Sequence, residues 1–174
     1  MKLRKKFGKR SLKQSCDVSD YSISLIAPED LASKVRILSE SLGLNFGKYI
    51  PHITLCWLGD DIPNFLFSSS GEKTLIQIEG FYVDIDQKGR VWVGLKVRLT
   101  DGLVKLRAEH ASRVGIEPGE VYSPHLTIGC ITEDALGSLN LSPLKDLAAI
   151  NGIYEFTLHV CHNGGFGKVK KIID

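Results

Sequence analysis

Apolar and polar residues alternate along seven short stretches of the chain, and turn-forming residues separate these stretches. Alternation with a period of two gives each face of a β-strand its own set of side chains. We therefore expect strands over residues 21–27, 49–59, 74–86, 91–97, 122–128, 153–161 and 169–173. The turn around Gly89 is typical of a β-hairpin, and Gly80 indicates a β-bulge.

A second pattern, with apolar residues three and four positions apart, predicts two α-helices. The first covers residues 28–42 and ends at Gly43, a residue type that commonly follows the last helical turn. The second covers residues 103–114 and is capped by Thr100 or Asp101. Shorter helices are expected near residues 63–67, from Thr132, and from Ser142 to Gly152.

Two of the predicted strands share the motif Tyr-x-Pro-His-apolar-Thr-apolar, at residues 49–55 and 122–128. Strand residues two apart share a face, so His52 and Thr54 point the same way. His125 and Thr127 repeat the arrangement 73 residues later (125 − 52). One His-x-Thr is commonly a chance pair on a solvated strand. A second copy with the same preceding Tyr-x-Pro favours a functional site.

The two halves of the chain also repeat an order of elements: a helix, a motif strand and then further strands. The simplest architecture is α+β, a bilobal pseudo-twofold domain with two antiparallel sheets flanked by helices and a central cleft. We expect this single domain over residues 20–174, after a basic, flexible tail over residues 1–19.

The composition changes this picture little. The chain has 174 residues, 43% hydrophobic and 24% charged, which is typical of one globular domain. Its apolar stretches are too short to span a membrane, so no membrane association is expected. The four cysteines are scattered, without a C-x-x-C pair or a secretory signal, which favours a reducing compartment such as the cytoplasm. We expect a monomer.

Charge is unevenly distributed along the chain. Residues 1–14 hold seven basic residues and no acidic one, which leaves 15 of the 22 basic residues against all 20 acidic ones. Such a tail is typically solvated and disordered. Its alternative roles are non-specific binding of a polyanion and service as a transit peptide. The acidic remainder argues against a broad nucleic-acid-binding surface and favours a small anionic ligand.

Two His-Thr pairs suit acid–base chemistry on a phosphodiester. Histidine titrates near neutrality, so a neutral imidazole can remove a proton from the nucleophile while a protonated one supplies a proton to the leaving oxygen. The threonine hydroxyls can hydrogen-bond the non-bridging phosphate oxygens. This chemistry needs no cofactor. It needs no metal either, and His159, Cys161 and His162 lack the spacing of common zinc sites.

At these motifs the chain resembles the 2H phosphoesterase superfamily, defined by two His-apolar-[Thr/Ser]-apolar motifs on a duplicated, bilobal α+β fold. Residues 51–55 and 124–128 match that pattern without departure, and the order of elements matches over residues 20–173. The resemblance implies a metal-independent phosphodiesterase. The implied site residues are His52, Thr54, His125 and Thr127.

The superfamily includes RNA-end cyclic phosphodiesterases, 2′-5′ ligase-like enzymes, nucleotide-binding members and phage anti-CBASS phosphodiesterases. The compact chain and its closely spaced motifs resemble the phage branch, which implies hydrolysis of a cyclic oligonucleotide second messenger in the cytoplasm of a host cell. An RNA-end 2′,3′-cyclic phosphodiesterase and a non-catalytic nucleotide-binding module are the alternatives.

Four further residues are predicted to bind the ribonucleotide substrate. Trp92 and Lys96 lie on the face of their strand opposite the valines, where an aromatic ring suits a base and a cation suits a phosphate. Glu155 lies on a polar strand face and can accept hydrogen bonds from a base edge. Tyr21 opens the first strand, where the chain resembles the phage enzymes in placing a base-stacking tyrosine. A plain surface position is the alternative for Trp92 and Glu155.

Other residues near the motifs are expected to be structural. Tyr49 and Tyr122 precede their histidines by an odd number of positions, so strand parity points them away from the site. Cys56 is expected to share the face of His52 as a buried thiol rather than a nucleophile. His110 is expected on the surface of its helix.

Overall fold

The computed structural model describes residues 21–44, 49–60, 71–86, 89–117, 121–132, 137, 139–140, 142–164 and 168–173. The predicted basic tail and the short helices predicted near residues 63–67 and after Thr132 lie outside these residues.

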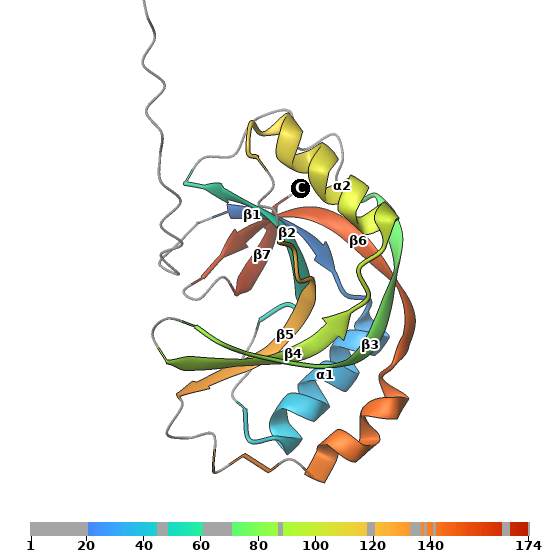
Figure 1. Cartoon of the computed structure of the whole chain (residues 1–174), viewed down its shortest axis with the longest axis vertical. Helices are drawn as coiled ribbons and strands as arrows, with labels where there is room; N and C mark the ends of the chain where they lie inside the picture. Colours follow the sequence, from blue (N-terminus) through green and yellow to red (C-terminus); the bar gives the residue numbers. More distant parts are fainter. Residues whose placement is uncertain are drawn as a thin grey trace, which may run out of the picture.

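All seven predicted strands and both long helices are present in the described chain (Figure 1). The strands are β1 (Tyr21–Ile26), β2 (His52–Gly59), β3 (Lys73–Ile85), β4 (Arg90–Val97), β5 (His125–Thr132), β6 (Gly152–Asn163) and β7 (Val169–Ile173). The helices are α1 (Glu29–Ser41), α2 (Asp101–Arg113) and the 3₁₀-helix η3 (Ser142–Ala149). The helix expected from Ser142 is thus a 3₁₀-helix.

The motif strands begin at their histidines, later than predicted. The residue before each histidine is a proline, which has no backbone N–H to donate to a sheet. Its carbonyl still accepts one bond: Ala27 N donates to Pro51 O at 3.0 Å, and Val97 N donates to Pro124 O at 3.2 Å. Both motifs are therefore anchored to the neighbouring strand in the same way.

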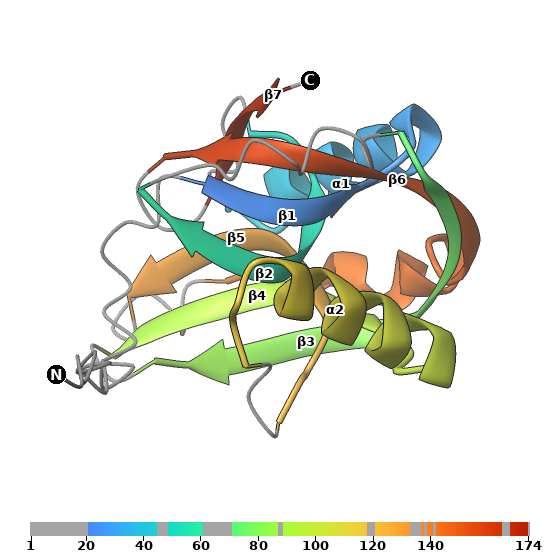
Figure 2. The ribbon, with the colours of Figure 1, turned by 90° about the horizontal axis from the view of Figure 1, so that it is seen from above.

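The strands form one antiparallel sheet in the order β2-β1-β6-β3-β4-β5, with β7 also paired to β6 (Figure 2). Reversing this order exchanges β2 with β5, β1 with β4 and β6 with β3, which confirms the predicted pseudo-twofold repeat. The two predicted sheets are halves of a single sheet. They are joined because β3 pairs with β6 from Lys73↔Thr157 to Ile78↔Gly152.

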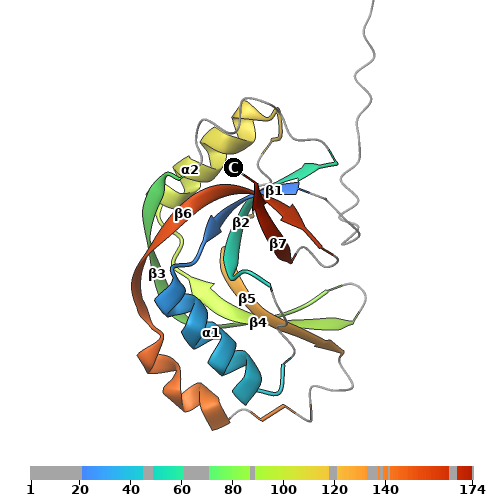
Figure 3. The ribbon, with the colours of Figure 1, turned by 180° about the vertical axis from the view of Figure 1, so that it is seen from behind.

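The sheet curls, so that its two edge strands approach each other (Figures 1 and 3). These edge strands, β2 and β5, carry the two motifs and contact one another. Helix α2 packs against β2, and α1 packs against β5. Each helix therefore supports the motif strand of the other half of the chain, which ties the two halves into one body.

The predicted helix ends are confirmed. The Thr100 hydroxyl accepts a hydrogen bond from Leu103 N at 3.2 Å and caps α2. Gly43 and Gly115 follow the two helices with φ of 75° and 69°, a conformation that costs glycine little. The register of β3 with β4 shifts between Ile78 and Gly80, so the predicted bulge is also present.

One side of the sheet and the inner faces of the helices form the core. The alternation predicted for β4 is confirmed, because its valines and Leu95 are buried. His110, predicted on the surface, is only 2% exposed. It lies two turns after Leu103 on the same face of α2, and that face packs against the sheet. Its Nδ1 has no hydrogen-bond partner among the described residues.

Candidate active site on the two motif strands

The four motif side chains alternate with core residues as predicted. Ile53, Leu55, Leu126 and Ile128 are at most 3% exposed, whereas both histidines and both threonines are only partly buried. The apolar residues thus hold β2 and β5 against the core. The His-Thr pairs lie on the opposite face of the same two strands, and these strands are in contact.

Both histidines make the same hydrogen bond. His52 Nδ1 lies 2.8 Å from Ile50 O, and His125 Nδ1 lies 2.9 Å from Ser123 O. A carbonyl oxygen can only accept, so Nδ1 carries the hydrogen in each ring. In the neutral form, Nε2 is then a hydrogen-bond acceptor; in the protonated form, Nε2 is a donor. In each imidazole, Nε2 therefore lies on the side of the ring that faces away from this carbonyl oxygen.

Tyr122 links the two motifs directly. Its hydroxyl donates to Thr54 O at 3.1 Å, so the second motif holds the backbone of the first. The Arg107 guanidinium lies over the Tyr122 ring, 4.4 Å from its centroid. Burial raises the pKa of Tyr122, which keeps the hydroxyl protonated as a donor. Strand parity predicted a packing role for Tyr122, but it did not predict the hydrogen bond to Thr54 O.

His125 lies in a more enclosed environment than an ordinary surface histidine. The Tyr82 ring is stacked on its imidazole, with ring centroids 4.3 Å apart and planes 3° apart. Burial lowers the pKa of His125, against the smaller opposing effects of the Ser123 carbonyl and the Asp84 carboxylate. Burial, followed by Asp84, raises the pKa of Tyr82 to about 12. The neutral form of His125 is thus favoured.

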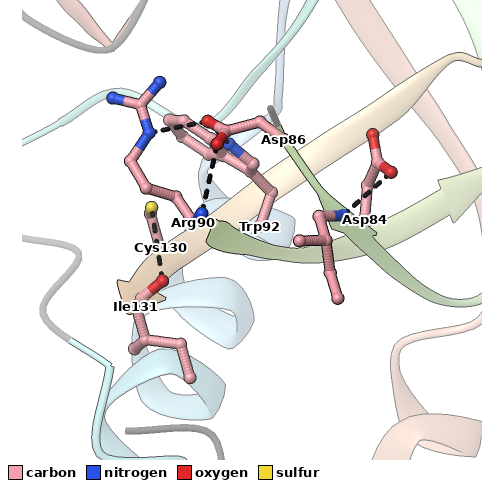
Figure 4. A network of polar contacts seen from close by, with 7 residues as sticks. Asp84, Asp86, Arg90, Trp92, Cys130 and Ile131 are labelled. Atoms are coloured by element: carbon pink, nitrogen blue, oxygen red, sulfur yellow. Dashed lines mark hydrogen bonds and ion pairs between the residues drawn. The ribbon is translucent and has the colours of Figure 1, made fainter. Parts of the chain in front are cut away.

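Trp92 lies beside Asp86 and Arg90 (Figure 4). It pairs with Cys130, two positions along β4 from the Gly94↔Thr127 pair, and shares the face of the sheet with Thr127. Its indole Nε1 donates to Asp86 Oδ2 at 3.0 Å. The same oxygen accepts from Arg90 Nε at 2.6 Å, and the guanidinium lies 5.5 Å from the Trp92 ring centroid. The indole is therefore fixed in orientation.

Lys96 pairs directly opposite His125 in the β4–β5 register, so both lie on one face. Its Nζ is 3.4 Å from Glu79 Oε1, and the side chain remains largely exposed. Among the four predicted substrate-binding residues, Lys96 and Trp92 thus share the face of the second motif.

The other two predicted binding residues lie further from their motif. Glu155 is on β6 opposite Leu75, and its carboxylate accepts from Lys73 Nζ at 2.7 Å. Tyr21 begins β1 opposite Gly59, at the far end of β2 from His52, and makes an edge contact with the His162 ring. The structure does not bring Glu155 or Tyr21 next to a motif histidine through strand pairing.

A β-bulge corrects the predicted face of Cys56. Ile23 pairs with Cys56 but Ser24 pairs with Thr54, so Leu55 is an extra residue on β2. Cys56 therefore turns to the core, where burial raises its pKa to about 11. The predicted buried thiol is confirmed, but it lies on the opposite face from His52.

The same bulge brings Trp57 to the motif face. Trp57 pairs with Ser22, two residues before Ser24, and is 46% exposed. Simple parity from His52 places it on the core face, so sequence reasoning missed this aromatic candidate. The signal available in the sequence, a tryptophan that follows a run of smaller apolar residues, was weak.

Two negative findings concern the described residues. No group of three or more His, Cys, Asp or Glu side chains in the ranges given above is placed to hold a metal ion. Within the same ranges, no helix has both the length and the apolar character needed to cross a membrane.

Comparison with solved structures identifies the fold. TT0787 of Thermus thermophilus superposes with a TM-score of 0.57 at 12% identity, covering 88% of this chain and 94% of that one. E. coli LigT, solved in complex with NADP+, superposes with a TM-score of 0.52 at 14% identity, covering 89% and 95%.

The fold is LigT-like. This confirms the predicted α+β fold class with its duplicated halves, although the two predicted sheets are one large antiparallel sheet. At these identities the likeness concerns the fold alone. No family model and no curated protein matches the chain.

Proposed function

We propose that this LigT-like chain is a metal-independent phosphodiesterase of the 2H type, which cleaves ribonucleotide phosphodiesters next to a 2′-oxygen. One observation carries the proposal: two His-Thr pairs lie on contacting edge strands. In each pair, the imidazole Nδ1 donates a hydrogen bond to the carbonyl oxygen of the residue two positions earlier. Two imidazoles that react through Nε2 supply one proton acceptor and one proton donor.

The two imidazoles carry out both proton transfers of the proposed reaction. The neutral imidazole removes the proton of a ribose 2′-hydroxyl as its oxygen attacks the adjacent 3′-phosphate. The P–O bond to the 5′-oxygen breaks, and the protonated imidazole gives its proton to that leaving oxygen. Thr54 and Thr127 hydrogen-bond the non-bridging oxygens, on which negative charge builds up. Water attack on a 2′,3′-cyclic phosphate uses the same two groups.

The preferred substrate is a cyclic di- or trinucleotide, as in a phage enzyme that removes an immune signal. Trp92, fixed by Asp86, offers a stacking surface for a base, and Lys96 opposite His125 offers a cation for a phosphate. RNA carrying a 2′,3′-cyclic phosphate end is the alternative substrate. LigT was solved with a dinucleotide, NADP+, which is in line with a nucleotide ligand for this fold.

The test is a substrate panel with EDTA-treated protein, containing cyclic oligonucleotides and RNA with 2′,3′-cyclic phosphate ends. Product mass distinguishes cyclic-phosphate products from linear ones. We expect turnover of the cyclic oligonucleotides. If neither class of substrate is turned over, the proposal is wrong. If calorimetry shows tight binding and the ligand is recovered unchanged, the chain is a binding module instead.

Histidine variants then test the assignment of the site. His52→Ala and His125→Ala should each lower kcat by about 10²- to 10⁴-fold. His52→Asn and His125→Asn are the matched controls, because an asparagine amide can keep the bond made by Nδ1 while Nε2 is lost. They should be folded and equally inactive. An active asparagine variant would mean that Nε2 has no part in the chemistry.

A further inference from the structure

The stack between Tyr82 and His125 joins two strands that are not neighbours. Tyr82 pairs with Gly94 on β4, and Gly94 pairs with Thr127 on β5. The phenol ring therefore crosses over β4 to reach the imidazole, with centroids 4.3 Å apart and nearly parallel planes. Its hydroxyl donates to Asp84 Oδ2 at 3.1 Å, which holds the far end of the ring.

The crossing depends on the absence of a side chain at Gly94. A Cβ at this position would lie 2.6 Å from Leu126 O and 3.3 Å from the Thr127 Cα, both backbone atoms of the motif strand. Glycine thus allows β4 to approach β5 closely at the second motif. Because glycine has no side chain, β4 also places nothing at this position between the Tyr82 ring and the His125 ring.

The first motif is built differently at the corresponding positions. Thr54 pairs with Ser24 on β1, and Ser24 pairs with His159 on β6. Under the twofold repeat, Ser24 and His159 therefore take the places of Gly94 and Tyr82. The phenol–glycine combination belongs to the second motif, which makes the two catalytic candidates chemically different.

We propose that Tyr82 is a positioning residue for His125, and this inference rests on the proposed function. The bond from Nδ1 to Ser123 O fixes where the imidazole points, but it leaves the ring free to tilt about that bond. The stacked phenol ring fixes the plane of the imidazole. Together they hold Nε2 in one direction. Proton transfer requires such alignment, and a displacement of about 1 Å can cost about 10²-fold in rate.

The kinetic test compares Tyr82→Leu with Tyr82→Phe. Leucine removes the aromatic face, so kcat should fall about 10- to 100-fold while KM stays within about twofold. Phenylalanine keeps the face and loses only the bond to Asp84, so it should retain kcat within about threefold. A Tyr82→Leu variant with wild-type kcat, or a Tyr82→Phe variant as slow as Tyr82→Leu, overturns the positioning role of the ring.

Tyr154→Leu is the matched control for loss of an aromatic ring. Tyr154 is also partly buried, and its hydroxyl donates to Ile150 O at 2.7 Å, outside the motif strands. This variant should keep its kcat even where its melting temperature falls as far as that of Tyr82→Leu. Equal losses of kcat in both variants would assign the effect to general destabilisation and overturn the inference.

A measurement without substrate separates this inference from the proposed function. The His125 ring protons are assigned in the NMR spectrum by their loss in His125→Asn. Tyr82→Leu should shift them strongly, because the ring current of the phenol is removed, whereas Tyr82→Phe should leave them nearly in place. Unchanged resonances in Tyr82→Leu overturn the stack. If the wild type cleaves no phosphodiester, the proposed function fails, and the NMR result alone decides whether Tyr82 orients His125.

Discussion

His125 is subject to opposing influences that a single substitution can separate. Burial lowers its pKa from the usual 6.5, while the Asp84 carboxylate and the Ser123 carbonyl favour the charged form. Its NMR titration midpoint should therefore lie below 6.5. Asp84→Asn removes the charge and keeps an acceptor for the Tyr82 hydroxyl, so the midpoint should fall further. An unchanged or higher midpoint in Asp84→Asn would show that the Asp84 charge does not reach His125.

Lys96 should contribute to binding rather than to proton transfer. It lies opposite His125 in register, where its ammonium group can approach a phosphate held between the motifs. Lys96→Ala should raise KM about tenfold, with kcat changed less than about threefold, because a charged hydrogen bond is worth about 1.5 kcal/mol. Lys105→Ala, on the exposed side of α2, is the control. The difference between them should shrink at high salt, and a lower kcat with constant KM would contradict the binding role.

At the scale of elements, the sequence was sufficient to predict the strands, both α-helices and the side of each strand that carries the motif. Their period-two and helical patterns are strong because one face of each element is buried. The bulges on the motif strands could not be predicted. An extra residue such as Leu55 or Ile128 cannot be recognised in the hydrophobic pattern. It nevertheless moves every later side chain of its strand to the opposite face from the one that parity predicts. The misplaced Cys56 and the missed Trp57 both follow from this.

The pairing of β4 with β5 should be intolerant of a side chain at Gly94. An added Cβ meets the Leu126 carbonyl oxygen at 2.6 Å, and a backbone atom in a paired strand cannot move aside cheaply. Gly94→Ala should therefore lower the free energy of unfolding by about 1–3 kcal/mol in urea titrations. Gly102→Ala is the matched control in the first turn of α2, where the nearest atom is 3.8 Å away. It should gain up to about 1 kcal/mol, and equal effects at both positions would contradict the close approach.

At the scale of the whole molecule, the repeat predicted two lobes, but not how they are joined. The pairing of β3 with β6 unites them, and contacts between β2 and β5 follow from the curl of the sheet. Pairings between segments far apart in sequence depend on this tertiary arrangement, not on local pattern. The link from Tyr122 to Thr54 is of the same kind. The motifs thus predicted the candidate site residues, while the relative placement of these residues emerged only from the fold.

His110 should make the stability of the whole fold sensitive to acid. It is buried, and within the described part of the chain its Nδ1 has no hydrogen-bond partner. Burial and Arg113 lower its pKa against the opposing effects of Glu109 and Glu72. The unfolded chain therefore binds a proton more readily than the folded one. Its contribution to stability is complete above the unfolded pKa of about 6.5 and is lost as the pH falls through the folded value.

His110→Leu isolates this effect, since leucine fills a similar space without a titrating group. Between pH 7 and pH 5, the free energy of unfolding should fall more steeply for the wild type, by at most about 1.4 kcal/mol per pH unit for one histidine. His125 also has a lowered pKa, but it titrates in both proteins and cancels in the difference. Urea titrations of the two proteins across this range are the measurement. Parallel curves would mean that His110 keeps its ordinary pKa, and that the helix α2 accommodates the charged ring by exposing it to water.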